Sequence, residues 1–465
     1  MSRATFAAII LAGALLRAAA LPGPGTGDLT VFKVWSYNAA RHGVADMYGI
    51  GGSPPEWRML EYAGAEAVVV YPPLVLYELG AAGQAYWLWS HHHFPNTTAL
   101  NAFIKLPGLV AECGLALLLF WLTRARLGLT TARWCVAAYW LNPAALMNAS
   151  ILGYLDAQFA LPAVAAIVAA STGWPTLAGA LVAVAGLTKP QGIFIGPAVA
   201  LALWMSGSPS LQQRARRMAA AAAGGLAVTA VVIAPFAIAG GLPNLIQAMQ
   251  RLTHHDMVSA NACNLWWIVG YLIRAWHSMH DMGVWAAFTA PAKILGITRM
   301  VDIGYPNPLV IGTALTIGTW IWAFWAAIGG STVRNQSATR DPQSAMDVWL
   351  VAGVAAFTFH AYATLSAQVH ENHLFGAVPL LVLAAAGRPA FKPICVVVSV
   401  IVALNLNLFY GFGNGIGYAL PRGLTVIDAT VVVSAINCAA LLWHAVVLNR
   451  QCSTAAARPL SSAPA

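Results

Sequence analysis

The feature that most constrains the fold is a series of apolar stretches, each about twenty residues long, that recurs along the whole 465-residue chain. An α-helix needs about 20 apolar residues to cross a hydrocarbon core of about 30 Å. Lipid offers no partners to backbone amides, so segments that cross it separately must be helical. Only 8% of the residues are charged, against about a quarter in soluble proteins, which excludes a water-soluble fold.

The stretches predict an all-α, polytopic integral membrane protein with about twelve spans, within a range of about 10 to 13. The predicted spans are residues 4–21, 104–123, 133–149, 157–172, 175–188, 191–206, 218–239, 308–329, 346–365, 373–387, 393–409 and 427–447. Residues 1–450 are expected to form one transmembrane domain. Residues 451–465, rich in Ala, Ser and Pro, are expected to form a disordered cytoplasmic tail.

Charge is distributed unevenly between the two sides of the predicted membrane protein. One side carries most of the basic residues, namely Arg3, Arg124, Arg126, Arg133, Arg214, Arg216, Arg217, Arg334, Arg340, Arg388, Lys392, Arg450 and Arg458. The positive-inside rule makes this side cytoplasmic and puts both termini there. Because the net charge of +9 is spread over these loops and forms no single patch, it does not indicate nucleic-acid binding.

The opposite side carries two long loops, residues 22–103 and 240–307, together with most of the acids and every histidine except His360 and His444. Within the first loop, residues 28–40 and 71–89 read as helices that lie on the membrane surface. If residues 71–89 crossed the bilayer instead, the later arginine clusters would face outside, so we reject that alternative. We therefore expect any chemistry on the outer side, facing the periplasm, the exterior or the lumen of the endoplasmic reticulum.

Asp28 follows the first predicted span closely and precedes a predicted helix. A carboxylate at a helix start can simply be the N-cap. At head-group depth it can also act as a general base. Its position alone leaves both interpretations open.

The remaining polar groups carry weaker signals. The histidines at 91–93 and 254–255 invite a metal site, but neighbouring side chains of an extended segment point to opposite sides, and no CxxC or HExxH motif accompanies them. We therefore predict no metal and no disulfide framework among the six cysteines. Glu112 and Asp428 fall in predicted spans, so we expect them to be protonated or buried between helices.

Several stretches, in order, resemble the GT-C glycosyltransferases, integral membrane enzymes that use polyprenyl-phosphate sugars. They are Asp28 with Phe32 and Trp35, the Tyr-Pro-Pro-Leu at 71–74, SILGYLD at 150–156, Lys-Pro-Gln at 189–191, SANACNLWW at 259–267 and HENHLF at 370–375. By these marks the chain is similar to the GPI mannosyltransferase II-like family and to the dolichyl-phosphate-sugar enzymes of N-glycan assembly. The resemblance extends to about residue 385. Leu152, Tyr154 and Asn372 depart from the family pattern.

The resemblance implies an inverting transfer of a hexose from a polyprenyl- or dolichyl-phosphate sugar to a glycan, lipid or protein acceptor on the outer side. Asp28 then corresponds to the general base. The residues implied in substrate binding are His370, Glu371, Lys189, Asp156, Gln191, Tyr71, Arg251 and His373. Mannose is the expected sugar, because HENHLF is nearer to the family's HERYLF box than to its HEKSIL box. The resemblance implies no metal and no other cofactor.

Two rival interpretations stay open at this stage. Lysine at a span end, as at Lys189, commonly extends to the lipid head groups without any catalytic role. The whole chain also fits a transporter or a flippase, or a glycosyltransferase-like protein without activity. Transporters, however, usually show inverted repeats and helices broken at the bilayer centre. Here the ionisable residues gather at the outer ends of the predicted spans instead.

Overall fold

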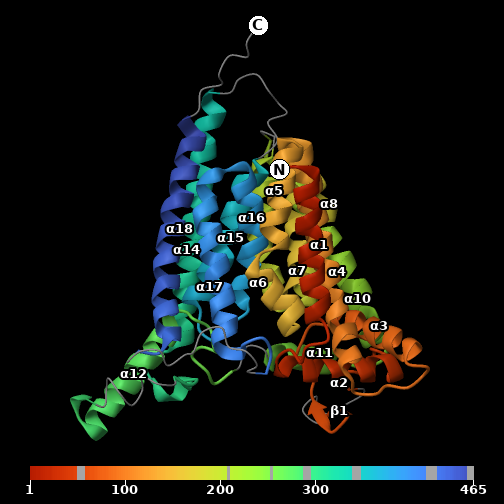
Figure 1. Ribbon diagram of the computed structural model, residues 1–465. Coiled ribbons are helices and arrows are strands. Elements are labelled where there is room, and N and C mark those ends of the chain that lie inside the picture. The colour runs from red at the N-terminus through yellow and green to blue at the C-terminus, as the bar shows by residue number, and fades with distance from the viewer. Residues whose placement is uncertain are drawn as a thin grey trace.

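The structure is a computed structural model that describes residues 1–49, 58–206, 210–251, 255–285, 295–337, 347–414 and 427–457. Long helices stand side by side in a bundle, and short helices lie at one of its ends (Figure 1). The N-terminus and the last turns of α18 lie together at the opposite end (Figure 1). Both ends of the described chain therefore lie on one side of the bundle, as an even number of spans requires.

The described residues form a succession of helices and one pair of short strands. In chain order these are α1 (Arg3–Ala20), α2 (Gly27–His42), β1 (Leu60–Tyr62), β2 (Ala65–Ala67), α3 (Leu74–Trp89), α4 (Thr98–Leu127), α5 (Leu129–Trp140), α6 (Pro143–Ala145), the π-helix η2 (Leu146–Leu152), α7 (Asp156–Ser171), α8 (Pro175–Thr188), η3 (Pro190–Ile195), α9 (Gly196–Met205), α10 (Leu211–Ile238), α11 (Leu242–Arg251), α12 (Leu265–Met282), η4 (Met300–Asp302), α14 (Pro308–Ser337), α15 (Val348–Leu365), η5 (His373–Gly376), α16 (Ala377–Gly387), η6 (Pro389–Phe391), α17 (Lys392–Tyr410) and α18 (Ala429–Ala457).

Every predicted span coincides with a helix or with a bent or broken helix. Among the described residues, 7 helices are long and apolar enough to cross a membrane, and α5 with α6 and η2 makes an eighth span with a bend of 42°. Shorter apolar helices, Asp156–Ser171, Pro175–Thr188, Pro190–Met205 and His373–Gly387, account for the other predicted spans. The prediction of an all-α polytopic membrane protein is confirmed.

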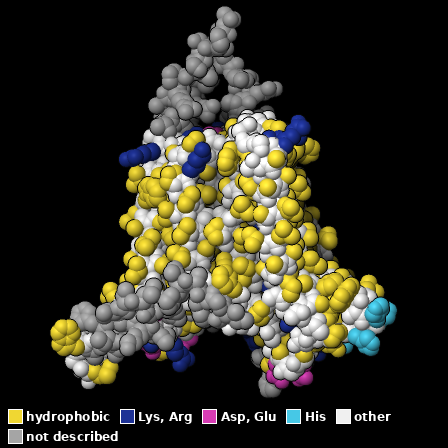
Figure 2. Space-filling view, viewed as in Figure 1, with side chains coloured by type: hydrophobic (Ala, Val, Ile, Leu, Met, Phe, Trp, Pro, Cys, Tyr) yellow, Lys and Arg dark blue, Asp and Glu magenta, His cyan; other side chains and the backbone are white. Residues whose placement is uncertain are grey.

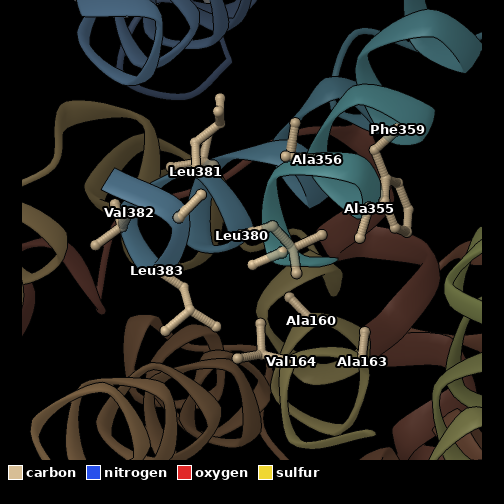
Figure 3. Close-up of a cluster of buried hydrophobic side chains, with 14 of the residues drawn as sticks. Ala160, Ala163, Val164, Ala355, Ala356, Phe359, Leu380, Leu381, Val382 and Leu383 are labelled. Atoms are coloured by element: carbon tan, nitrogen blue, oxygen red, sulfur yellow. The ribbon is translucent and has the colours of Figure 1, made fainter. Parts of the chain in front are cut away.

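The outside of the bundle is suited to lipid. Apolar side chains cover its middle, whereas charged side chains lie near its two ends and histidines near one of them (Figure 2). Leu117 of α4 and Val231 of α10 are 69% and 74% exposed, which would be unfavourable in water and is expected against hydrocarbon. Inside the bundle, α7, α15 and α16 meet through alanine, valine and leucine side chains, with Phe359 beside them (Figure 3). The small alanines let the three helix backbones approach closely.

Helices occur at both places in the loop at 22–103 where the sequence predicts them. Helix α2 covers the first predicted surface segment, and α3 begins at Leu74, directly after the two prolines. A proline ring removes an amide donor and restricts the residue before it, so the helix starts behind the pair. The sequence did not reveal the antiparallel pair of β1 and β2, in which Leu60 faces Ala67 and Tyr62 faces Ala65. Strands of 3 residues are too short to show an alternating pattern.

Two predictions about the C-terminal part need correction. Helix α18 continues to Ala457, so the expected disordered tail over 451–465 is wrong for residues 451–457, and residues 458–465 lie outside the described chain. Asp428, expected within a span, instead precedes α18 and accepts hydrogen bonds from the backbone nitrogen of Thr430 and from that of Leu295. The carboxylate is buried, as the sequence predicted, and it caps the start of α18.

A buried ion pair joins α1 to α4 inside the bundle. Arg17 Nε donates to Glu112 Oε2 over 2.8 Å, and neither residue is exposed. The same guanidinium donates to the carbonyl of Trp140 over 2.7 Å, and Ser150 Oγ donates to Glu112 over 3.3 Å. Glu112 is therefore buried between helices, as the sequence predicted, and Arg17 supplies the charge that makes its burial tolerable.

Replacement of Arg17 by Leu should destabilise the protein strongly, because it leaves the Glu112 carboxylate buried without its cation. Removal of one partner from a buried pair costs about 3–5 kcal/mol, whereas replacement of both by apolar residues is often neutral. The double variant Arg17→Met/Glu112→Leu should therefore regain most of the lost thermal stability. Tryptophan fluorescence during heating in detergent measures this, with Arg126→Leu at the exposed end of α4 as control. A double variant no more stable than Arg17→Leu would contradict the account.

Candidate active site

The segment at 150–156 leaves the π-helix η2 and enters α7 through a tight reversal at Gly153. Gly153 has φ 79°, a left-handed conformation that favours glycine, and its turn lets the Tyr154 amide donate to the Asn148 carbonyl over 2.9 Å. The turn sends Tyr154 and Asp156 to different neighbours. Tyr154 donates its hydroxyl to Glu371, while Asp156 meets Lys189. The segment at 150–156 therefore contacts both the Lys-Pro-Gln motif at 189–191 and the HENHLF motif at 370–375.

Asp156 and Lys189 form an ion pair that is sealed from water. Lys189 Nζ lies 2.5 Å from Asp156 Oδ1, and the two side chains are 2% and 0% exposed. Asn148 Nδ2 donates to the other carboxylate oxygen over 2.7 Å. Asp156 is also the first residue of α7, where the helix dipole favours a negative charge. The interpretation of Lys189 as a lysine that extends to the head groups is therefore wrong.

The stretch after Lys189 turns the chain from α8 into α9. Helix α8 ends at Thr188, Lys189 is extended, and Pro190 opens the short 3₁₀ helix η3. Gln191, in that helix, is buried, and its Nε2 atom has no hydrogen-bond partner within the described chain. The side-chain amide of Gln191 therefore has an N–H donor without a partner in the described chain, and it lies two residues after Lys189 of the ion pair.

The loop that carries His370 and Glu371 is held by the segment at 258–261 from the second outer loop. The Ala260 amide donates to the Val369 carbonyl over 2.9 Å, and the Gln368 amide donates to the Val258 carbonyl over 3.0 Å. Ala260 and Asn261 each form an isolated β-bridge with His370. Two motifs that lie more than a hundred residues apart in the sequence therefore form one structure.

Glu371 is buried at the centre of a set of hydroxyl groups. Tyr154 donates to its Oε1 atom, and Tyr410 contributes a further hydrogen bond. Burial raises the pKa of Glu371, and the hydrogen bonds from the tyrosines oppose that rise in part. His370 lies beside it, with Nδ1 4.0 Å from Oε2.

The two histidines of the motif differ in their surroundings. His370 is 43% exposed and borders open space, yet protein surrounds it closely enough that desolvation lowers its pKa to about 4. Its ring is therefore neutral at pH 7 and offers one N–H donor. His373 stacks on Tyr362 with a ring separation of 5.8 Å and pairs with the tyrosine hydroxyl over 3.1 Å. Its ring also lies 5.4 Å from that of His370.

Asp28 lies in the first turn of α2, and Thr26 is the N-cap, so the capping interpretation of Asp28 is wrong. Gly25, just before the helix, has φ 66°, and a Cβ there would meet the Leu152 carbonyl oxygen at 2.7 Å. The Thr26 amide donates to that same carbonyl over 3.1 Å. The start of α2 is thereby fixed against the segment that carries Asp156.

The carboxylate of Asp28 lines a cavity of about 390 Å³ together with Phe32, Trp35, Glu66 and Tyr71. It forms no hydrogen bond or ion pair with any residue in the described ranges, so it is free to meet a ligand. Asp28, Phe32 and Trp35 of one predicted motif and Tyr71 of the next therefore meet at this cavity.

The charges that act on Asp28 show that the motifs converge. Desolvation raises its pKa most, the Glu371 carboxylate adds to the rise, and His370 and Lys189 oppose it. Asp156 also acts on it, in the same direction as Glu371. The pKa of Asp28 therefore depends on four of the titratable groups that the sequence selected.

Tyr71 lies at the cavity of Asp28, and Arg251 lies at the end of α11. The ring of Tyr71 lies 5.5 Å from that of Trp35 at the cavity wall, and desolvation, helped by the negative charge of Asp28, raises the pKa of its hydroxyl well above the usual value. Arg251 ends α11, whose Leu245 and Ala248 pack against the first outer loop. It is not among the charges that act most strongly on Asp28 or His370.

Lys105 is a residue that the sequence analysis missed. Its ammonium donates to the backbone carbonyls of Ala20, Gly23, Ser150 and Ile151 over 2.7–3.2 Å. It therefore joins the end of α1 and the approach to Asp28 to the segment that carries Asp156. No sequence signal could have identified this role, since its partners are main-chain atoms.

The two histidine runs differ in position, and His255 of the second run lies edge to face against His370, with ring centroids 6.1 Å apart. His91 and His92 have φ values of 55° and 67° in an exposed turn after α3, and His254 lies outside the described residues. No group of three or more His, Cys, Asp or Glu side chains suited to a metal ion is found in the described ranges.

Replacement of Lys189 by Met should loosen the chain locally, because Asp156 would be buried without its cation at a cost of about 3–5 kcal/mol. Hydrogen–deuterium exchange, followed by mass spectrometry, should rise in residues 148–156 and 189–195. Exchange in Lys392→Met, which removes an exposed lysine at the other end of the bundle, should match that of the original protein. The double variant Lys189→Met/Asp156→Asn should restore slow exchange. Equal exchange in Lys189→Met and the original protein would contradict a structural role for the pair.

Comparisons with known proteins return little sequence similarity. No protein-family model matches the chain, and no curated protein matches it. Among solved structures, it is similar to the crystal structure of the oligosaccharyltransferase of Archaeoglobus fulgidus, tethered to an acceptor peptide containing the NVT sequon. The identity is 14% and the TM-score 0.40, and the match covers 97% of this chain and 55% of the other.

Proposed function

We propose that this protein is a membrane glycosyltransferase of GT-C type that transfers a hexose from a polyprenyl-phosphate sugar to an acceptor hydroxyl. The observation that carries the proposal is the position of Asp28. Its unpaired carboxylate lines a cavity at the same end of the bundle as the short helices, within electrostatic reach of His370, Glu371, Lys189 and Asp156. The first two motifs of the resemblance thus line this cavity, and charged groups of three later motifs act on its carboxylate.

The proposed reaction is a single displacement with inversion at the anomeric carbon. The acceptor oxygen forms a bond to that carbon while the bond from the carbon to the phosphate oxygen breaks. Asp28 takes the proton of the acceptor hydroxyl, and the polyprenyl phosphate leaves with the electron pair of the broken bond. A base must come within hydrogen-bond distance of the proton it removes, and Asp28 has no competing partner in the described chain.

The raised pKa of Asp28 suits this role. A base is more effective when its pKa lies closer to the working pH, and desolvation in the cavity moves the pKa of this carboxyl upwards from its usual value of 3.8. Asp28 can thus accept a proton at physiological pH more readily than an aspartate in water.

The developing phosphate charge would meet hydrogen-bond donors rather than a free cation. Lys189 is already paired with Asp156, and His370 is neutral at pH 7. The available donors are the N–H of the half-exposed His370 and the hydroxyl of Tyr71 at the cavity wall. Donors that are fixed before the reaction stabilise charge without reorganisation during it.

We propose further that the donor reaches the cavity from the bilayer, that its sugar is mannose, and that the acceptor arrives from the outside. The cavity would then face the periplasm, the exterior or the lumen, with both termini in the cytoplasm. Helix α2, which carries Asp28, lies at one end of the bundle, whereas transporters bind their substrates near the bilayer midplane, so its position favours this enzyme over the transporter alternative.

Replacement of Asp28 by Asn should lower the turnover number by about 10²–10⁴, since a positioned general base contributes that much. The assay uses purified protein with radiolabelled polyprenyl-phosphate mannose and a panel of acceptors. Asp281→Asn, which removes an exposed carboxylate of α12, is the control and should keep full activity. Undiminished transfer by Asp28→Asn would remove the base assignment. Movement of an intact lipid or solute without a new glycosidic bond would instead favour a transporter.

The transfer rate should fall as the pH is lowered, because protonated Asp28 cannot accept a proton. The fall should follow a pKa above 3.8, since desolvation and Glu371 raise the pKa of this carboxyl. A profile of kcat/KM from about pH 4 to pH 8 measures it. The same acid limb should persist in His370→Gln and be absent from the residual activity of Asp28→Asn. A profile that stays flat over this range would contradict the role of Asp28.

A further inference from the structure

We propose that the small hairpin of β1 and β2 forms a subsite for a carbohydrate, and thus that the acceptor of this protein is a glycan and not a bare peptide or lipid. The inference rests on the proposed function, which requires an acceptor hydroxyl at Asp28. It concerns a second cavity of about 500 Å³, lined by Tyr37, Tyr62, Phe94 and both hairpin glutamates, Glu61 and Glu66.

The hairpin cavity adjoins the cavity of Asp28. Glu66 lines both of them, and the inner one also contains Met59 and Ala67 from the hairpin and its approach. Each volume, about 500 and about 390 Å³, lies within the range of small-molecule sites. A ligand that occupies the hairpin cavity can therefore extend to Asp28.

The wall of the hairpin cavity is aromatic. The ring of Tyr37 stacks on that of Tyr62 at 4.9 Å, and Phe94 meets both rings edge to face at 5.1 and 5.4 Å. The Tyr62 hydroxyl donates to the Phe94 carbonyl over 2.8 Å, which fixes the group. A rigid aromatic wall with a few polar groups is the usual lining of a ligand site, and it suits the C–H face of a sugar ring.

The two glutamates supply the polar side of this subsite. Glu61 and Glu66 stand directly opposite each other across the hairpin and are both exposed. Like charges at such a position destabilise a strand pair. Neither carboxylate has an ion-pair or hydrogen-bond partner among the residues described. Ligand hydroxyl groups would supply the donors that the protein does not, and carboxylates form strong hydrogen bonds with such donors.

The aromatic wall and the adjoining base together select a carbohydrate over other ligands. Two carboxylates alone would also accept an ammonium group, but an amine at this place would leave Asp28 without a hydroxyl to deprotonate. A sugar offers an apolar face for the rings, several hydroxyl donors for the glutamates and one further hydroxyl that can reach Asp28. One unit of the acceptor would lie at the hairpin while its neighbour presents the reacting oxygen.

Glu66→Gln provides the first test, by direct binding in the absence of any donor. The probes are the methyl glycosides of mannose, glucose and galactose and an α-linked mannobiose, followed by saturation-transfer NMR and calorimetry on protein in lipid nanodiscs. Loss of a charged acceptor should weaken the binding of the recognised sugar by about tenfold. The variant also relieves a like-charge pair, so its thermal stability should not fall, and weaker binding cannot then result from unfolding.

Tyr37→Leu should bind the same sugar more weakly, because it removes part of the aromatic wall. Asp281→Asn on α12 should bind the sugar as tightly as the original protein does. Absence of binding by every sugar would overturn the proposal. The proposal would also be overturned if Glu66→Gln bound the sugar as tightly as the original protein. Glu66-dependent binding of a Ser/Thr-rich peptide that carries no sugar would overturn it as well. The binding test contains no donor and so does not depend on catalysis. If the protein binds sugar through Glu66 but shows no transfer activity, the subsite is supported and the proposed function fails.

Discussion

The ion pair between Lys189 and Asp156 is the interaction on which the rest of the site depends. It joins the start of α7 to the turn between α8 and α9, and its burial makes it costly to open because either charge alone would be left without water. The same short segment that carries Asp156 also sends Tyr154 to Glu371 and accepts the start of α2 through Leu152. With this pair closed, three separate stretches of chain share one rigid frame.

This frame explains how Asp28 can stay unpaired. The carboxylates of Asp156 and Glu371 are satisfied by Lys189 and by the tyrosines Tyr154 and Tyr410, so no nearby acid competes for the groups around the cavity. Asp28 is left with desolvation and a nearby negative charge, both of which raise its pKa. Asp28 is exposed at the cavity, and a carboxyl with a raised pKa and no structural partner is a candidate for chemistry.

Much of this arrangement could be predicted from the sequence, and the physical reasons for the failures are specific. The length of the apolar stretches predicted the spans, and the two prolines before Leu74 predicted the start of α3. The motifs gave Asp28, Asp156, Lys189, His370 and Glu371 as members of one site. The pairing of Lys189 could not be predicted, because snorkelling, phosphate binding and a buried ion pair have the same local sequence. The hairpin and Lys105 escaped notice since their roles depend on backbone contacts between distant segments.

The central claim is that a lipid-linked sugar reacts between Asp28 and the His370–Glu371 loop. The most direct measurement is a cryo-electron microscopy structure in lipid nanodiscs with an unreactive phosphonate analogue of a polyprenyl-phosphate sugar. The account predicts the anomeric carbon within the cavity of Asp28, with space for an acceptor oxygen about 3 Å from its carboxylate and the phosphonate near His370. Density for the sugar at the other end of the bundle, or in a passage that runs between the helices, would contradict it.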